Sequence, residues 1–310
     1  MSRIYLSPPD ISNQDRFAVQ SAFDSGWVAP VGPDLDAFEA EVAIRVDRSY
    51  ACAVNSGTSA LHLALLALGI KPGDRVICPS LTFAGCAFPI TYCGAEPIFV
   101  DSESDTWNMD CKLLKSAIET SLAEGRKPKA VIVVQIYGQC AKMDPLLTLC
   151  NEHQIPVIED AAESMGASYK GKPAGSFGDL SFLSFNGNKI ITTSGGGMLL
   201  GNDLALIEKA RYLSQQAREP VLHYEHKAIG YNYRLSNILA ALGRSQLTDL
   251  DRRILIRKKH FEAYTQSIGK LPGILFMPIS SEGSPNYWLS CIILDRTQSK
   301  VSRDELISIC

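Results

Sequence analysis

The sequence lacks an excess of basic residues and any long apolar run. Its 310 residues include 30 Lys and Arg against 33 Asp and Glu, which gives a net charge of -3. Without a basic surface, no nucleic-acid partner is expected. The longest apolar stretch, residues 61–70, is interrupted by His62 and is too short to cross a bilayer. We therefore expect no membrane partner.

Two further classes of motif are missing. The nine cysteines are scattered singly, without a CxxC pair or a Cys/His spacing suited to zinc, so no metal site is predicted. Such cysteines are typical of reduced, mostly buried thiols, and the amino terminus does not predict a signal peptide. The expected compartment is the cytoplasm. The patterns GxGxxG and GxxxxGKS are also lacking, which argues against a dinucleotide or ATP ligand.

The apolar pattern that is present predicts an α/β protein. After an extended arm at residues 1–12, helices are predicted up to Phe23 and over residues 34–46. From Tyr50 onward, strand-like and helical runs alternate. Strands are predicted at residues 50–55, 74–79, 96–101, 129–135, 155–160 and 197–202, and helices at 58–68, 83–92, 111–122, 145–153 and 203–216. Apolar strands without polar alternation indicate a mostly parallel sheet covered by helices on both faces, a three-layer arrangement.

The last part of the chain predicts a second, smaller unit. A polar loop is expected at residues 218–233, followed by one long helix over 236–268. Strand-like pieces follow at 273–278 and 286–294, and a helix is starting where the chain stops at Cys310. We predict a large cofactor-binding domain over residues 1–235 and a smaller α+β domain over residues 236–310, which we expect to be incomplete.

Candidate ligand-binding residues follow the predicted strands, because ligands of open parallel sheets bind beyond the carboxyl ends of the strands. Gly57, Thr58 and Ser59 form a turn that leads into a helix and could bind a phosphate. The same SGTS turn is also an ordinary helix cap that needs no ligand. Phe83 follows the second strand and could stack on a flat ring, or it could be a core residue.

A second set of candidates comes from later strands. Glu159 and Asp160 end the strand at 155–160, where a carboxylate could bind a protonated ring nitrogen or cap a helix. Lys189 lies in a predicted loop before three glycines, and Ser184 in the same loop could donate to a phosphate. A lysine can form a Schiff base with an aldehyde, although most lysines are surface residues.

One ligand would use all of these groups. A phosphate, a planar ring, a pyridine nitrogen and an aldehyde are the four parts of pyridoxal phosphate. Each pattern alone has an ordinary structural explanation, but together they predict pyridoxal 5'-phosphate as the cofactor. Lys189 would then be its covalent anchor and Asp160 the partner of its ring nitrogen.

The motifs also resemble a known family, the DegT-type (DegT/StrS) nucleotide-sugar aminotransferases, which are pyridoxal-phosphate enzymes of fold type I. The resemblance runs from about Tyr5 to Leu294 and is most specific around the lysine. It is carried by SGTSALHLAL, PSLTFAG, IEDAAESMGA, FGDLSFLSFNGNKIITTSGGGML and GYNYRLSNILAALG.

The resemblance implies a role for each matching residue. Lys189 matches the lysine that holds the cofactor, and Asp160 matches the carboxylate paired with the pyridine nitrogen. Glu163 lies where the family has a polar residue beside the cofactor ring, and Phe83 matches the aromatic stacked on that ring. The remaining matches concern the phosphate: Gly57, Thr58 and Ser184 in the same subunit, and Asn232, which would reach the phosphate of a neighbouring subunit.

The implied activity is transfer of an amino group from glutamate to a 4-keto nucleotide-linked sugar by a ping-pong mechanism. Within the family, the sequence resembles members that aminate UDP-linked 4-keto-6-deoxy-N-acetylhexosamines in bacterial glycan synthesis. The implied assembly is a homodimer with shared active sites. Lys189 separates the chain from relatives that carry histidine there and act as dehydratases.

Two alternatives remain open at this point. Relatives usually continue for several tens of residues, so the chain could be a shortened, non-catalytic remnant or a binding module. It could also be a pyridoxal-phosphate sugar enzyme of another reaction type, such as a dehydratase or aldolase.

Overall fold

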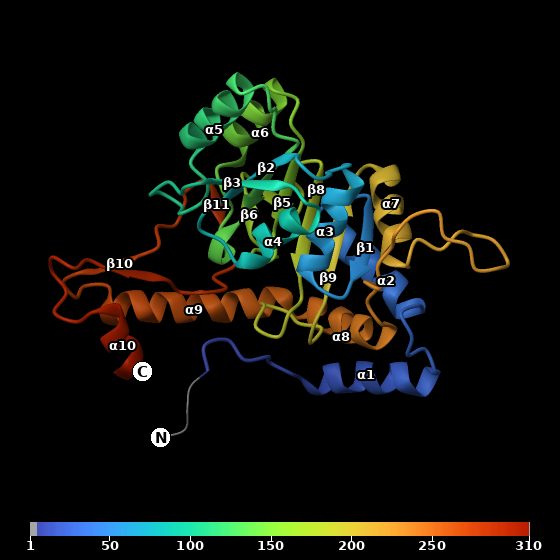
Figure 1. Cartoon of the computed structure of the whole chain (residues 1–310). Helices are drawn as coiled ribbons and strands as arrows, with labels where there is room; N and C mark the ends of the chain where they lie inside the picture. Colours follow the sequence, from blue (N-terminus) through green and yellow to red (C-terminus); the bar gives the residue numbers. More distant parts are fainter. Residues whose placement is uncertain (1–4, 310) are drawn as a thin grey trace.

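The computed structural model describes residues 5–309 (Figure 1). The first four residues of the predicted arm and Cys310 lie outside this range. Residues 5–12 contain no helix or strand, and α1 (Asn13–Ser25) begins at a capping box formed by Ser12 and Asp15. Gly26 ends α1 in the left-handed conformation at φ 76°, and α2 (Pro33–Arg45) follows with proline in its first turn. Both predicted amino-terminal helices are confirmed.

A seven-stranded sheet forms the centre of the molecule, in the order β1-β9-β8-β5-β4-β2-β3. Neighbours from β8 to β3 pair in parallel, whereas β9 runs antiparallel to both β1 and β8. The mostly parallel sheet is confirmed. The strands are β1 (Tyr50–Val54), β2 (Arg75–Pro79), β3 (Glu96–Val100), β4 (Ala130–Val134), β5 (Val157–Asp160), β8 (Leu180–Ser184) and β9 (Gly197–Gly201). Of these, β8 was not predicted, and Ser184 ends this strand instead of lying in a loop.

Helices cover both faces of the sheet (Figure 1). Alternate residues of the strands other than β3 enter two separate cores: Ala51 and Ala53 of β1 enter one, and Cys52 and Val54 enter the other. The first core also contains residues of α2, α5 (Cys111–Ala123), α6 (Met143–Glu152) and α8 (Asn237–Thr248). The second contains residues of α3 (Gly57–Ala67), α4 (Ala84–Tyr92) and α7 (Leu204–Ser214). The predicted three-layer α/β architecture is therefore confirmed.

The long helix predicted over residues 236–268 is wrong in one respect, because it is two helices. α8 ends at Thr248, and α9 (Leu250–Ile268) begins after Asp249, whose ψ of 2° departs from the helical value. α8 packs against α1 and α2, whereas α9 extends away from them toward β10, below the sheet in the view of Figure 1. Because the break gives α8 and α9 different directions, the apolar faces of the two helices contact different neighbours. The division into domains at residue 235 stays a prediction.

The carboxyl-terminal segment is less regular than predicted. β10 (Ile274–Phe276) pairs with β12 (Ile292–Leu294), and α10 (Arg303–Ile309) follows. The strand predicted over 286–294 therefore exists only at its end. Short strands β6 (Ser168–Tyr169), β7 (Lys172–Pro173) and β11 (Gly283–Ser284) form a small separate sheet. Within residues 5–309, no helix combines the length and apolar character needed to cross a membrane.

Candidate active site

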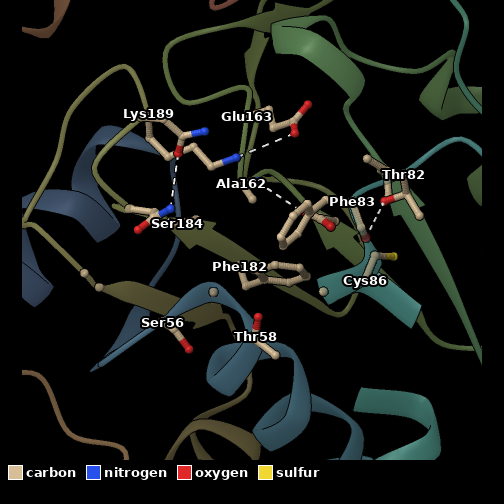
Figure 2. A pocket seen from close by; sticks show the side chains of 18 of the residues that line it. Ser56, Thr58, Thr82, Phe83, Cys86, Ala162, Glu163, Phe182, Ser184 and Lys189 are labelled. Carbon is tan, nitrogen blue, oxygen red and sulfur yellow. Dashed lines mark hydrogen bonds and ion pairs between the residues drawn. The ribbon is translucent and has the colours of Figure 1, made fainter. Parts of the chain in front are cut away.

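A cavity of about 360 Å³ lies where several strands of the sheet end (Figure 2). The loops after β1, β2 and β8 and the end of β5 all contribute to its lining. Because these strands are parallel, their carboxyl ends meet at one edge of the sheet, where ligands of such folds bind. The strand order brings together side chains that are more than 130 residues apart in the sequence.

One wall of the cavity is the start of α3. The Ser56 side chain caps this helix by accepting a hydrogen bond from the Ser59 amide at 3.0 Å. Gly57, Thr58 and Ser184 line the same wall. A Cβ on Gly57 would lie 3.0 Å from Cβ of Ser184, so glycine keeps this corner open. A helix amino terminus with nearby hydroxyl groups favours an anion.

The Ser59 hydroxyl is placed differently. It donates to Oδ1 of Asn55 at 2.7 Å and lies 2.9 Å from Oγ of Ser56, and it is not among the groups that line the cavity. Ser56, which was not predicted, takes the position facing the cavity. Ser59 contributes to the turn chiefly through its backbone amide.

Phe83 lies at the cavity entrance rather than in the core. Its side chain is 73% exposed, and the residue precedes α4 as its N-cap. The alternative explanation as a packed core residue is therefore wrong. Phe182 of β8 also lines the cavity, so the site has aromatic side chains from two elements (Figure 2). An exposed aromatic beside a cavity can stack on a planar ligand.

The two adjacent carboxylates, Glu159 and Asp160, point to opposite faces of β5. Glu159 is fully buried and accepts hydrogen bonds from the amides of Gly175 at 2.9 Å and Phe177 at 2.8 Å, which is a structural role. Asp160 faces the cavity, and its Oδ1 accepts a hydrogen bond from the Ala162 amide at 3.0 Å. The strand alternation thus selects Asp160 as the candidate.

Burial raises the pKa of Asp160 to about 7. The neighbouring charges of Glu163 and Glu159 also raise this pKa, whereas the Ala162 amide and the charge of Lys189 lower it. A buried carboxyl of this kind gains strongly from a cationic partner.

Lys189 is held inside the cavity. Its side chain is 12% exposed, and its Nζ lies 3.6 Å from Oε1 of Glu163 and 4.2 Å from the ring centroid of Trp288. Figure 2 shows the Lys189 amine and the Glu163 carboxylate pointing toward one another. The other oxygen of Glu163 accepts a hydrogen bond from the Tyr137 amide at 2.7 Å. The alternative of an ordinary surface lysine is therefore wrong.

Asn232, another predicted site residue, lies at a different cavity of this chain. Its carbonyl accepts a hydrogen bond from Nδ2 of Asn55 at 3.3 Å, and it lines a second cavity of about 710 Å³ together with Arg218 and Arg234. A single chain therefore does not bring Asn232 into the lysine cavity.

The comparison with protein families agrees with this geometry. The model of the DegT/DnrJ/EryC1/StrS aminotransferase family matches residues 9–310. The chain belongs to this family. The prediction of a pyridoxal-phosphate-dependent aminotransferase is confirmed at the level of the family.

Three relatives illustrate the membership. EpsN of Bacillus subtilis (strain 168), assigned as a pyridoxal phosphate-dependent aminotransferase, is 53% identical over 293 residues, which cover 94% of this chain and 76% of EpsN. GDP-perosamine synthase of Caulobacter vibrioides (strain ATCC 19089 / CIP 103742 / CB 15) is 39% identical, over 99% of this chain and 81% of the synthase. DesI, crystallised in the presence of its TDP-sugar product, superposes with a TM-score of 0.89 at 27% identity, over 99% of this chain and 76% of DesI.

The residues present fit the cofactor of the DegT/DnrJ/EryC1/StrS family. Asp160 is a buried carboxylate whose side chain accepts only one hydrogen bond, from the Ala162 amide, among the described residues. The start of α3 and Ser184 can hold a phosphate, and a lysine amine lies in the same cavity. These groups match the protonated ring nitrogen, the phosphate and the aldehyde of pyridoxal phosphate.

Trp288 is a residue of the lysine cavity that was not predicted from the sequence. It lies in a segment predicted as a strand, 99 residues beyond Lys189 by the numbering, and contacts the amine only after folding. No local signal marks it. Its neighbour Asn286 is also buried, and an asparagine without exposure is itself unusual enough to draw attention in a structure.

Proposed function

We propose that this chain transfers an amino group from glutamate to a nucleotide-linked 4-keto sugar, using Lys189 as the reactive amine. The observation that carries the proposal is the placement of Lys189 and Asp160 in one cavity at the sheet edge, with Glu163 3.6 Å from the amine. A lysine with a largely buried side chain beside the Glu163 carboxylate, in a cavity that also contains the buried Asp160 carboxyl, is an arrangement typical of a reactive site.

Each residue has a distinct task in this proposal. Pyridoxal phosphate, when bound, supplies an aldehyde that carries the amino group and a ring that takes up the electron pair of the bond that breaks. Asp160 holds a proton at the ring nitrogen by its negative charge. Lys189 anchors the cofactor, and its Nζ takes up the proton from the α-carbon of the amino donor. Gly57, Thr58 and Ser184 bind the phosphate, and Phe83 covers the ring.

The sugar substrate is the finer part of the proposal. Two relatives support a nucleotide-linked substrate for this chain. One is named for a GDP-linked sugar, and the other was crystallised in the presence of a TDP-linked sugar. The sequence resemblance favours a UDP-linked 4-keto-6-deoxy-N-acetylhexosamine, which would make the protein an enzyme of bacterial glycan synthesis. The mechanism would be ping-pong, because donor and sugar would use the same amine in turn.

We also propose that two copies share their active sites. The loop over residues 217–230 projects from the body at the right of Figure 1, and it exposes Leu222, Tyr224 and Ile229. Asn232 lies at the base of this loop, outside the lysine cavity of its own chain. A projecting apolar loop supports contact with a second copy, in which Asn232 would reach the partner's phosphate site. We further propose that the protein is located in the cytoplasm, because the eight cysteines of the described residues are all free thiols, as expected in a reducing compartment.

The role of the lysine is tested with Lys189→Ala. The wild-type protein should show visible absorbance from bound cofactor, which borohydride removes, and the variant should lack this absorbance. Incubation with glutamate and a panel of UDP-, GDP- and TDP-linked 4-keto sugars, followed by mass spectrometry, identifies the product. Undiminished transamination by Lys189→Ala would refute the assignment, and no aminated sugar from any wild-type incubation would refute the reaction.

The shared site is tested by mixing two inactive variants. Lys189→Ala and Asn232→Ala change different halves of each proposed site, so a mixed dimer restores one intact site. After unfolding and refolding together, the mixture should recover about a quarter of the wild-type activity, because half of the dimers are mixed. Recovery of no activity, with each variant folded, would contradict the shared site.

A further inference from the structure

The carboxyl-terminal segment 286–288 is joined to the loop that carries Glu163. Nδ2 of Asn286 donates to the carbonyl oxygens of Glu163 at 2.9 Å and Met165 at 3.0 Å. Its Oδ1 accepts a hydrogen bond from the Trp288 amide at 2.9 Å, and its backbone amide donates to the Gly138 carbonyl at 2.9 Å. A Cβ on Gly138 would collide with Oδ1 of Asn286, so glycine is needed there. These four bonds set the position of Trp288.

The indole of Trp288 is also tied to the lysine loop. Its Nε1 donates to the carbonyl of Asn188 at 2.7 Å, and Asn188 directly precedes Lys189. The ring is only 5% exposed, and its centroid lies 4.2 Å from Nζ of Lys189. A cation close to an indole face is attracted by the ring quadrupole, most strongly where water is excluded.

Trp288 also contributes to the lining of two cavities. One is the lysine cavity of about 360 Å³, and the other is a cavity of about 250 Å³ beside α9 and β12, distinct from the cavity at Asn232. A smaller side chain would join the two and admit water to the amine from the α9 side. The indole is therefore a wall as well as a contact.

We propose that Trp288 is a positioning residue that holds the amine of Lys189 beside Glu163 and shields it from the cavity next to α9. The proposal rests on Lys189 being the reactive amine, as stated above. It makes the carboxyl-terminal segment part of the working site, although the segment contributes no group to the reaction itself. Asn286 sets the position of the indole and has no direct contact with the lysine.

The test measures the reactivity of Lys189 in cofactor-free protein. Wild type, Trp288→Leu and Trp288→Phe are treated briefly with a limiting amount of acetic anhydride, and acetylation of each lysine is followed by peptide mass spectrometry. Loss of a desolvated cation–π contact should make Lys189 of Trp288→Leu react about tenfold faster. Trp288→Phe keeps a ring but loses the N–H donor, so its Lys189 should react at an intermediate rate.

An internal control separates local from general effects. Lys142 is ion-paired with Glu103 at 3.2 Å and Asp105 at 2.6 Å, outside the lysine cavity. Its acetylation should be the same in all three proteins. A general loosening of the fold would raise the rates of both lysines together, and this outcome would overturn the proposal.

A single-turnover measurement with cofactor and amino donor gives a second readout. The rate should fall in both variants, while the donor concentration needed for half the maximal rate stays near the wild-type value. If Trp288→Leu does not fold, Trp288→Phe decides by the same measurements. If Lys189 in the folded variants is acetylated at the same rate as in wild type, the inference is overturned. The proposed function is unaffected by this outcome, because it depends on the separate Lys189→Ala result.

Discussion

The raised pKa of Asp160 predicts how the stability of the cofactor-free protein depends on pH. Burial raises this pKa from the ordinary 3.8 to about 7. The folded protein then holds the proton more tightly than the unfolded chain, so this residue's stabilising contribution is complete below the unfolded pKa and is lost as pH rises toward the folded one. Three pKa units correspond to about 4 kcal/mol across the whole window, and about 2.5 kcal/mol is expected to be lost between about pH 5 and pH 8.

Asp160→Asn should remove this dependence. An asparagine keeps an oxygen that can accept the hydrogen bond from the Ala162 amide, but it carries no charge at high pH. Urea unfolding of both cofactor-free proteins at the two pH values measures the difference, and the titrating groups that do not interact with Asp160 cancel in the comparison. The variant should be the more stable protein at pH 8 and lose about 2.5 kcal/mol less than wild type on the way there.

A control and a second condition make the reasoning testable. Glu119→Gln removes a carboxylate from an exposed helix pair with Lys115, in which the charged atoms are 3.8 Å apart, and it should not reproduce the effect. Addition of pyridoxal phosphate should favour wild type, since the Asp160 carboxylate then gains a cationic partner. Equal pH dependence of wild type and Asp160→Asn without cofactor would refute the assignment of a buried, protonated carboxyl.

Two further substitutions test the walls of the cavity. In Gly197→Ala the new Cβ would lie 2.5 Å from the Ser56 carbonyl oxygen, which should cost about 1–3 kcal/mol in urea unfolding and weaken cofactor binding. Gly187→Ala in the lysine loop meets its nearest atom only at 3.8 Å and should be neutral, so equal losses would contradict the packing argument. Phe83→Leu should weaken pyridoxal phosphate binding about three- to tenfold in a titration without lowering the unfolding midpoint, because the ring is exposed. Phe88→Leu, a change of an exposed aromatic ring within α4, should leave the affinity unchanged, and an equal loss there would argue against stacking by Phe83.

Most of the strands could be read from the sequence because their apolar character is local. The runs at β1, β4 and β5 lack polar alternation, as expected for strands that are covered on both faces. The missed strand β8 contains two serines among its five residues. Ser181 is fully buried and donates to the Gly175 carbonyl, so its polarity is compensated by a contact that the local sequence does not contain.

The helix break at Asp249 could not be read from the sequence for a related reason. Residues on both sides of it are helix formers, and no proline or glycine interrupts residues 244–268. The break follows from packing, because α8 contacts α1 and α2 whereas α9 extends away from these helices toward β10 (Figure 1). Helical periodicity reports that a face is apolar and does not report which neighbour covers it.

The sequence by itself determined the types of the groups in the site. A lysine in a glycine-flanked loop, a carboxylate at the end of an apolar strand and an SGTS turn before a helix are each local patterns whose chemistry depends on residue type. Taken together, these groups predicted the cofactor, the alternating apolar runs predicted the fold class, and the resemblance of five motifs implied the family.

Only the tertiary structure decided which of these groups work together and in what surroundings. It turned Asp160 toward the cavity and Glu159 away from it, replaced Ser59 by Ser56 at the cavity wall, and brought Trp288 to the amine of Lys189. Burial, the raised pKa of Asp160 and the contact between the indole and the amine depend on residues that are distant in the sequence. Long-range packing sets these properties, because the field and the solvent exposure at an atom depend on everything that surrounds it.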